Sequence, residues 1–213
     1  MTVAITQFID RVRPEARTAP TFTLSDYVLE AAIEFCARSR YWRADLTALN
    51  AVADQAAYTA SPPSTESVIQ DIISVRHNTI ILEPASQEML DSQYLDWRTE
   101  TGSQADFWFA TARDNITLVP YPSAAGTANI EIRAALKPSR TATTLPQSLY
   151  DNYKAEIASG ALAWLLVMPG VPWASPDRAA YHERKFEDGI RHANYTAARG
   201  FNRTPIRTRR PPF

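Results

Sequence analysis

The sequence predicts an α+β protein with a helical bundle, a central small antiparallel β-module and an extended C-terminal arm. The bundle consists of an N-terminal helix and a C-terminal helical hairpin, and both have the 3–4 residue spacing of buried helix faces. The middle of the chain has short alternating segments broken by turn residues instead. We therefore expect helices at 1–43, the β-module with one short helix at 44–138, the hairpin at 145–200 and the arm at 201–213.

The N-terminal part contains two predicted helices. A short one covers residues 5–13 and ends near Pro14. A longer one covers residues 25–42, with Ser25 as its N-cap. Its expected buried face consists of Leu29, Ala32, Ile33 and Cys36.

The β-module begins with two weakly alternating segments and continues with two hairpins. Residues 67–77 form a strong strand candidate, which a tight turn at Asn78-Thr79 connects to a partner at 80–83. Residues 86–97 are expected to form a helix capped by Ser86.

The second hairpin and a last strand complete the module. Residues 107–112 and 116–120 form the hairpin, and residues 128–138 form the strand, with Ile130 and Ile132 on one face. In residues 107–112, alternation places Phe107 and Phe109 in the core and leaves Trp108 as a contact residue.

The hairpin at 145–200 has two long helices joined by a proline-rich turn. The first carries a buried stripe and many small residues, which permit close approach of a neighbouring helix. The stripe is Leu149, Tyr153, Ile157, Ala161, Trp164 and Met168. The second starts with Ser175 as cap and Pro176 in its first turn, and Gly200 lies near its C-cap.

The sequence assigns no catalytic, cofactor or metal site. His77, His182 and His192 lie in different elements without metal-ligand spacing, and we interpret His182 as a solvated side chain. Cys36, the single cysteine, is interpreted as a small core residue. No phosphate-binding glycine loop is present. We expect no enzyme, although a glycosidase-like acid pair stays open.

Charge further limits the function. The chain has a net charge of −1, and the four arginines of the arm leave −5 on residues 1–200. An acidic body disfavours sequence-specific DNA binding, because phosphates require a basic surface. Glu183, Glu187 and Asp188 alternate with Arg184 and Lys185, which is typical of an ion-paired solvated surface.

The chain also lacks a signal-peptide pattern, and its longest apolar stretch, 157–168, is too short to cross a bilayer. We expect a soluble protein that is made in a reducing compartment and has no membrane contact.

The order of these elements resembles the head-to-tail adaptor (head-completion or connector) proteins of tailed bacteriophages. The resemblance rests on AAIEFCARSRYW at 31–42, SVIQDIISVRHNTIILEP at 67–84, SQEMLDSQYLDW at 86–97, FWFATARDNITLVPYP at 107–122 and the hairpin at 145–200. It implies a structural virion protein in the neck, in a ring of typically twelve copies beneath the portal. The helices would pack between neighbours, and the β-module would face the downstream tail or nozzle protein. Genomic DNA would pass through the lumen without sequence-specific binding.

In this reading the arm binds the portal protein. Its expected partner-binding residues are Phe201, Arg203, Ile206, Arg207, Arg209, Arg210 and Phe213. Alternatives are docking by the helices with a frayed arm, a tail-side terminator or stopper ring, a small hydrolase or nuclease, and a nucleic-acid-binding module that uses the basic arm.

Overall fold

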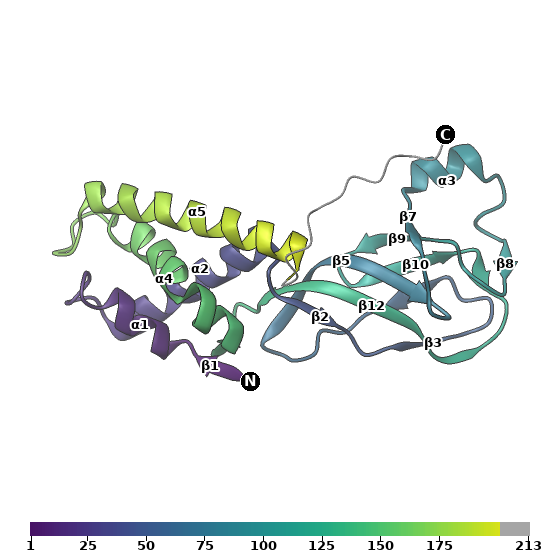
Figure 1. Cartoon of the computed structure of the whole chain (residues 1–213), viewed down its shortest axis with the longest axis horizontal. Helices are drawn as coiled ribbons and strands as arrows, with labels where there is room; N and C mark the ends of the chain where they lie inside the picture. Colours follow the sequence, from purple (N-terminus) through teal and green to yellow (C-terminus); the bar gives the residue numbers. More distant parts are fainter. Residues whose placement is uncertain (201–213) are drawn as a thin grey trace. The chain divides into compact units, whose positions relative to one another are not determined.

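The computed structural model describes residues 1–200 and confirms the α+β class (Figure 1). The chain divides into two compact units. The described part of the helical unit comprises residues 1–42 and 138–200, and the β unit comprises residues 43–137. The β unit is therefore inserted between the two halves of the helical unit along the chain.

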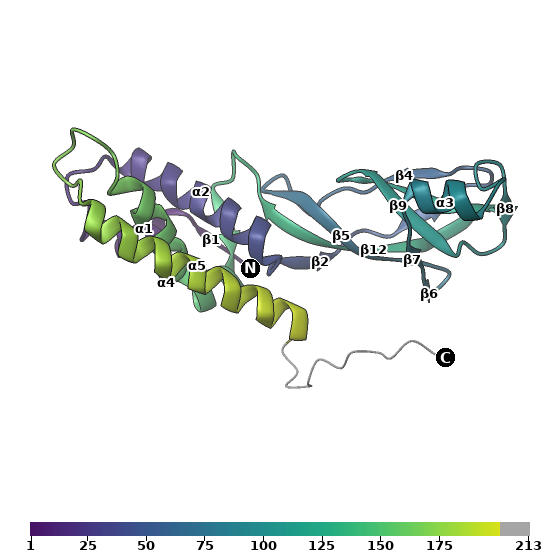
Figure 2. The same cartoon turned by 90° about the horizontal axis from the view of Figure 1, so that it is seen from above.

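The helical unit contains four of the described helices and a two-stranded ribbon. The helices are α1 (Thr6–Val12), α2 (Thr21–Ser39), α4 (Gln147–Leu165) and α5 (Pro176–Arg199). The ribbon pairs β1 (Thr2–Ala4) antiparallel with β13 (Thr144–Pro146), and the sequence pattern did not predict it. α1, α2 and α5 each pack against α4 around one continuous apolar core (Figure 2).

The helix α2 begins four residues before its predicted N-cap, so the assignment of Ser25 as cap is wrong. Pro20 occupies the N-cap position with an extended backbone. Ser25 lies inside the helix, where its hydroxyl donates a hydrogen bond to the carbonyl of Thr21 at 3.0 Å. Serine competes for backbone groups in either position, so its presence alone does not locate the helix start.

The buried face of α2 is also rotated from the predicted one. Ala32 and Cys36 are fully buried as expected, whereas Leu29 and Ile33 are only half-buried. Leu29 and Ile33 lie at the edge of the buried face, because the packing of α1, α4 and α5 against α2 sets its centre. The other residues of α2 in the core are Leu24, Val28, Ala31, Phe35 and Ser39.

The helices α4 and α5 approach closely through glycines, as the small residues of this region predict. A Cβ atom on Gly160 would lie 2.7 Å from Cε2 of Phe186, and one on Gly189 would lie 2.5 Å from Cγ of Glu156. These contacts pair an earlier residue of α4 with a later residue of α5, so the helices run antiparallel. Ser175 lies at the N-cap of α5, but its side chain makes no capping hydrogen bond.

The β unit contains three sheets and the short helix α3 (Gln87–Gln93). One sheet has the order β4 (Ala57–Thr59), β10 (Asn115–Val119), β9 (Phe107–Ala112) and β7 (Glu83–Pro84). The second has the order β2 (Arg43–Asp45), β12 (Gly126–Pro138), β5 (Ser67–His77) and β6 (Ile80–Ile81), and β3 (Leu49–Ala51) also pairs with β12. The third pairs β11 (Tyr121–Pro122) with β8 (Thr101–Gly102).

The predicted antiparallel module needs one correction. The pairings β7–β9 and β8–β11 are parallel. Within the segment 80–83, Ile80 and Ile81 pair with β5 and the amide of Leu82 donates to the carbonyl of Val75 at 3.0 Å, whereas Glu83 pairs with β9 in the other sheet. The turn itself is confirmed: Asn78 and Thr79 both have positive φ, at 49° and 74°, as a type I′ turn requires.

The helix α3 starts as predicted but ends early. The hydroxyl of Ser86 accepts a hydrogen bond from the amide of Met89 at 3.2 Å, which confirms the cap. The helix ends at Gln93 instead of Trp97. The indole of Trp97 is buried and donates to Asp91 at 2.9 Å, so it joins the core without being helical.

The interpretation of Trp108 as a contact residue is wrong. Trp108 is 7% exposed and Phe109 is 6% exposed, so the first half of β9 is covered on both faces, whereas Ala110, Thr111 and Ala112 are exposed. On one face Phe109 packs against Trp97 and Leu90 of the α3 region, with the two rings edge to face at 5.5 Å. A strand covered on both faces is continuously apolar, and simple alternation does not describe it.

Candidate partner interface

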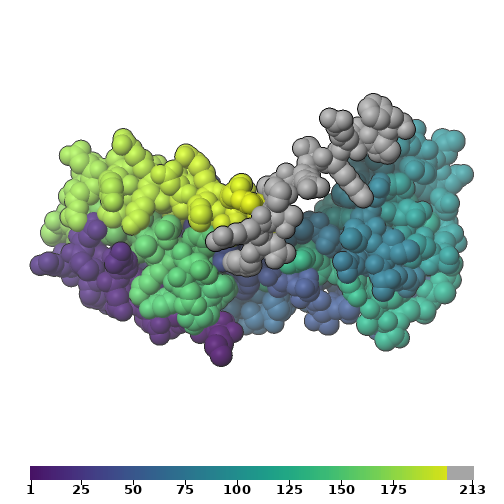
Figure 3. All heavy atoms as spheres, viewed as in Figure 1, coloured from purple at the N-terminus to yellow at the C-terminus, as the bar shows by residue number. Residues whose placement is uncertain are grey.

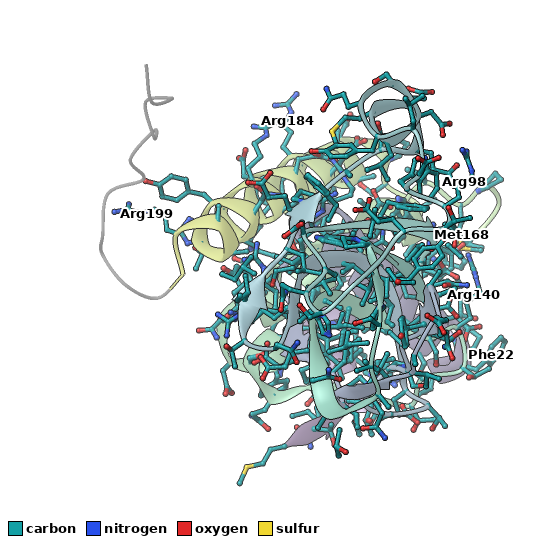
Figure 4. All side chains as sticks on the ribbon, turned by 90° about the vertical axis from the view of Figure 1, so that its right-hand side faces the viewer. Phe22, Arg98, Arg140, Met168, Arg184 and Arg199 are labelled. Atoms are coloured by element: carbon teal, nitrogen blue, oxygen red, sulfur yellow. The ribbon has the colours of Figure 1, made fainter. Side chains whose placement is uncertain are left out.

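The outer face of α5 combines tyrosine with charged residues. Tyr181 and Tyr195 are 63% and 52% exposed. The inward residues of the helix are Ala179, His182, Phe186, Gly189, Ile190 and Ala193. Figure 3 shows the surface of α5, in yellow-green, and Figure 4 shows Arg184 projecting from it into solvent. Tyrosine and arginine are enriched where proteins bind one another, so this face is a candidate partner interface.

A groove of about 810 Å³ lies along this face, within the helical unit. We call it the α5 groove. Its lining residues come from α4, α5 and the residue Tyr41 that follows α2. They are Tyr41, Asn152, Tyr153, Glu156, Tyr181, Arg184, Lys185, Asp188, Gly189, His192 and Thr196.

The floor of the groove depends on local backbone features. Gly189 has no side chain, and the stem of Glu156 fills the space where its Cβ would lie. Tyr153 interrupts the helical backbone of α4 with φ −135° and ψ 18°. The side-chain amide (Nδ2) of the neighbouring Asn152 donates to the carbonyl of Ser148 at 2.9 Å and to the hydroxyl of Tyr41 at 3.3 Å. These bonds hold Tyr41 beside the break.

The groove has an aromatic wall. The rings of Tyr41 and Tyr153 meet edge to face at 4.7 Å, and Tyr153 lies 6.5 Å from the ring of His192. Burial raises the pKa of Tyr41 and the pKa of Tyr153, so both hydroxyls stay protonated at neutral pH. Tyr153 is only 5% exposed, so the accessible ring surface of the wall comes from half-buried Tyr41 and exposed His192 and suits aromatic or proline side chains of a partner.

The charges around α5 differ from the predicted pattern. Glu187 does not pair with Arg184 or Lys185 but forms a two-bond contact with Arg38 of α2. This contact lowers the pKa of Glu187 and raises the pKa of Arg38. Asp188 pairs with Arg191 at 3.0 Å. Sequence neighbours on one helix point in different directions, so alternation along the chain did not identify these partners.

The interpretation of His182 as a solvated side chain is wrong. His182 is 7% exposed, and its Nε2 lies 2.8 Å from Oε2 of Glu15 in the turn after α1. The same carboxylate contacts Arg178, so Glu15 connects the α1–α2 turn to α5. His182 follows exposed Tyr181 on the helix, which made it resemble a surface residue in the sequence. Its role is structural.

The other candidates for chemistry also lie in structural positions. Cys36 is fully buried, as predicted, and burial raises the pKa of its thiol. His77 is 1% exposed, and its Nδ1 accepts a hydrogen bond from the amide of Ala105 at 3.1 Å. Burial lowers the pKa of His77, so the neutral ring is favoured. Within residues 1–200, no three His, Cys, Asp or Glu side chains gather as metal ligands.

The sequence did not identify the α5 groove, although one signal for it was present. Tyr181 is an aromatic residue on a charged helix face, and such a residue indicates a contact surface. The contributions of Tyr41 and Asn152 depend on tertiary packing and had no local signal. The predicted partner-binding residues, Phe201, Arg203, Ile206, Arg207, Arg209, Arg210 and Phe213, lie outside the described residues.

Among the described helices, none is long and apolar enough to span a bilayer.

The comparison with known proteins gives one family. No curated protein matches the chain. A family model described as SU10 adaptor protein matches residues 1–209, which is nearly the whole sequence. This match confirms the family predicted from the order of elements, and the name of the family indicates a phage adaptor protein. The chain belongs to the SU10 adaptor protein family.

Proposed function

We propose that the protein is a structural head-to-tail adaptor whose copies form a ring between the portal and the tail and allow DNA to pass. Membership of an adaptor family supports a structural role in the virion and implies a protein without catalytic activity. The neck of the virion is the place where such a ring acts. The copy number of twelve comes from the resemblance to head-to-tail adaptors and is part of the proposal.

The distribution of charge is the observation that carries this proposal. The β unit contains 12 Asp and Glu and 6 Arg and Lys, a net charge of −6. The described part of the helical unit contains 11 acidic and 12 basic residues, a net charge of +1. A β unit with this charge repels phosphate groups. DNA can then pass it without being held, while the neutral helical unit is free to pack against neighbouring copies.

We propose that the divisions of the chain are also divisions of function. The helical unit, acting as the predicted bundle of residues 1–43 and 145–200, packs between neighbours through the outer face of α5. The β-module at 44–138 faces the downstream tail or nozzle protein. Tyr181 and the α5 groove provide aromatic surface of the kind that dominates binding energy in protein interfaces.

The arm at 201–213 is proposed to bind the portal. Phe201, Ile206 and Phe213 would be apolar anchors, and the four arginines would pair with portal carboxylates or backbone carbonyls. Three prolines limit the conformational freedom of the free arm and thus the entropy that is lost when it binds. Arginine can make planar two-bond contacts that lysine cannot.

Imaging of the purified chain mixed with its portal tests the proposal. A second ring beneath the portal ring is expected. Deleting residues 201–213 should leave a folded chain that no longer binds the portal. A variant with lysine at 203, 207, 209 and 210 keeps the charge of the arm and serves as the matched control. If it binds as weakly as the deletion, two-bond arginine contacts are required.

Three results would contradict parts of this proposal. Full portal binding by the truncated chain would assign docking to the helices. A ring that binds tail proteins but no portal would identify a tail-side terminator or stopper. Salt-sensitive DNA binding that disappears with the four arginines would identify a nucleic-acid-binding module.

A further inference from the structure

The α5 groove extends toward the end of α5 that precedes the arm. Its lining residues on this helix run from Tyr181 to Thr196, and α5 itself ends at Arg199. The chain continues for 13 residues beyond Gly200. We propose that, before assembly, residues 201–213 occupy the α5 groove of their own chain. This inference deepens the proposed function, since it gives the arm a resting site that the portal must displace.

The chain can reach the groove from its own helix. Gly200 has φ +67°, a conformation that turns the chain away from the helix axis and that glycine adopts without strain. From Thr196 back to Tyr181 the helix rises by about 22 Å. If extended, the segment from Pro205 to Phe213 spans about 25 Å, which matches this length. Residues 201–204 remain for the reversal of direction.

The side chains of the groove suit the composition of the arm. Proline-rich segments bind surfaces lined by aromatic rings, because the proline and aromatic faces are flat and apolar and the stiff chain loses little entropy. In the groove, exposed Tyr181 and half-buried Tyr41 present ring surface above the buried Tyr153, and the arm offers three prolines and two phenylalanines.

The groove also offers partners for the arginines. Among the described residues, Glu156 takes part in no salt bridge, although it lies at the groove floor. Within residues 1–200, Asp188 pairs only with the exposed Arg191 on its own helix, and such pairs contribute little to stability. An arginine from the arm can bind both oxygens of either carboxylate. Arg184 and Lys185 on the same rim disfavour an arm that is charged along its whole length, so the prolines and phenylalanines should lie beside them.

The arm of the same chain has an advantage over the arm of a second copy. A segment joined to its site by a short connection has an effective concentration in the millimolar range. Free copies at micromolar concentration cannot compete with this unless their binding is much tighter. Binding in the same chain also covers Tyr181 and thus the outer face of α5. The free chain is then protected from association with other copies until the portal takes the arm.

A spin label at the end of the arm tests this inference in the full chain. Phe213→Cys introduces the only reactive thiol, because Cys36 is fully buried. A nitroxide at position 213 should broaden the NMR signals of Tyr181, Arg184 and Lys185 in the same chain, because the end of the arm lies at that end of the groove. In a mixture of isotope-labelled chains without nitroxide and unlabelled chains with it, these signals should stay sharp. Broadening only in the mixture would overturn binding within one chain, and no broadening in either sample would overturn the site.

Two tyrosine variants provide the matched comparison. Tyr181→Ala removes an exposed ring of the groove and should lower the ratio of bound to free arm about fivefold. Tyr195→Ala removes an exposed ring on the same helix that does not line the groove, and the ratio should not change. Equal effects of both would contradict the assigned site.

Portal binding by the truncated chain is a separate measurement. If the spin label shows that the arm lies outside the groove, while truncation of the arm abolishes portal binding, only the proposal that the arm rests in the groove is refuted. If the spin label shows that the arm lies in the groove, while the truncated chain still binds the portal fully, only the proposed role of the arm in portal docking is refuted.

Discussion

Replacing Gly160 by alanine tests whether the contact between α4 and α5 is as close as the structure indicates. The new Cβ atom would lie 2.7 Å from Cε2 and 2.8 Å from Cδ2 of Phe186, which is closer than real carbon atoms approach. The Phe186 ring is 3% exposed and lies 6.3 Å from Phe35 and 6.1 Å from Trp164, so it cannot easily move aside. The α5 groove is lined by the same two helices, so the substitution also tests the helix packing on which the groove depends.

Two opposing effects determine how much Gly160→Ala changes the free energy of unfolding. Alanine in a helix interior is favoured over glycine by about 1 kcal/mol. Overpacking of a buried contact costs about 1–3 kcal/mol. Because Phe35 and Trp164 hold the Phe186 ring in place, we expect the overpacking cost to lie in the upper part of this range, at about 2–3 kcal/mol. After the gain in helix propensity is subtracted, Gly160→Ala should lower the free energy of unfolding of the helical unit by about 1–2 kcal/mol, and the melting temperature by roughly 5–10 °C.

Thermal and urea unfolding followed by circular dichroism measure this change. Ala180→Gly, at an exposed position of α5, measures the propensity difference alone. Combining Gly160→Ala with Phe186→Leu should restore part of the stability, because the smaller side chain leaves room for the new methyl group. A Gly160→Ala chain as stable as the parent would refute the close contact, and so would strictly additive effects in the double variant.

Three further outcomes follow from buried and paired groups. Burial lowers the pKa of His77 below the ordinary 6.5, so the unfolded chain binds a proton first. As pH falls below about 6.5, stability should decrease by up to about 1.4 kcal/mol per pH unit until the lowered pKa is reached, and His77→Gln should remove this slope in urea titrations. The pKa of Glu187 lies below the ordinary 4.5 because Arg38 donates hydrogen bonds to it, so its stabilisation is present above pH 4.5 and is lost as pH falls through the lowered pKa. Glu187→Gln should cost about 0.5–1 kcal/mol at pH 7 and nothing once the carboxylate of the parent is protonated, and a constant cost would contradict the ion pair. Cys36 should react with a thiol reagent at the rate of unfolding only, and Gly160→Ala should accelerate the reaction; fast labelling of the native parent would contradict its burial.

The parts of the fold that could be predicted from the sequence are those with local signals. The bounds of β5, the turn at Asn78-Thr79 and the cap at Ser86 each depend on neighbouring residues, and all three are confirmed. The pairing of β1 with β13 joins segments about 140 residues apart, and no local pattern records it. The same holds for Glu15, which reaches His182 across the helical unit.

The candidate interface also has parts with a local sequence signal and parts that depend on tertiary packing. Charge and proline content mark the arm in the sequence, whereas the α5 groove exists only because Gly189, the break at Tyr153 and the position of Tyr41 come together in the fold. None of these residues is unusual in its own segment. A groove made by packing of three separate elements therefore required the structure.

The uneven charge of the two units determines how copies can associate. In a ring, each β unit of net charge −6 repels its neighbours, so cohesion has to come from the nearly neutral helical unit and its tyrosines. Salt screens this repulsion, with a Debye length of about 10 Å at 0.1 M and about 3 Å at 1 M. It strengthens the burial of aromatic surface only weakly, so the weaker repulsion is its main effect on association. We therefore expect the proposed ring to form at lower protein concentration as NaCl is raised, measured by analytical ultracentrifugation on a chain truncated after Gly200, in which no arm covers the outer face of α5. The charged contacts between arm and portal should weaken over the same range. Ring formation that weakens with salt would mean that opposite charges hold the copies together, and the β unit would then have to be part of the contact.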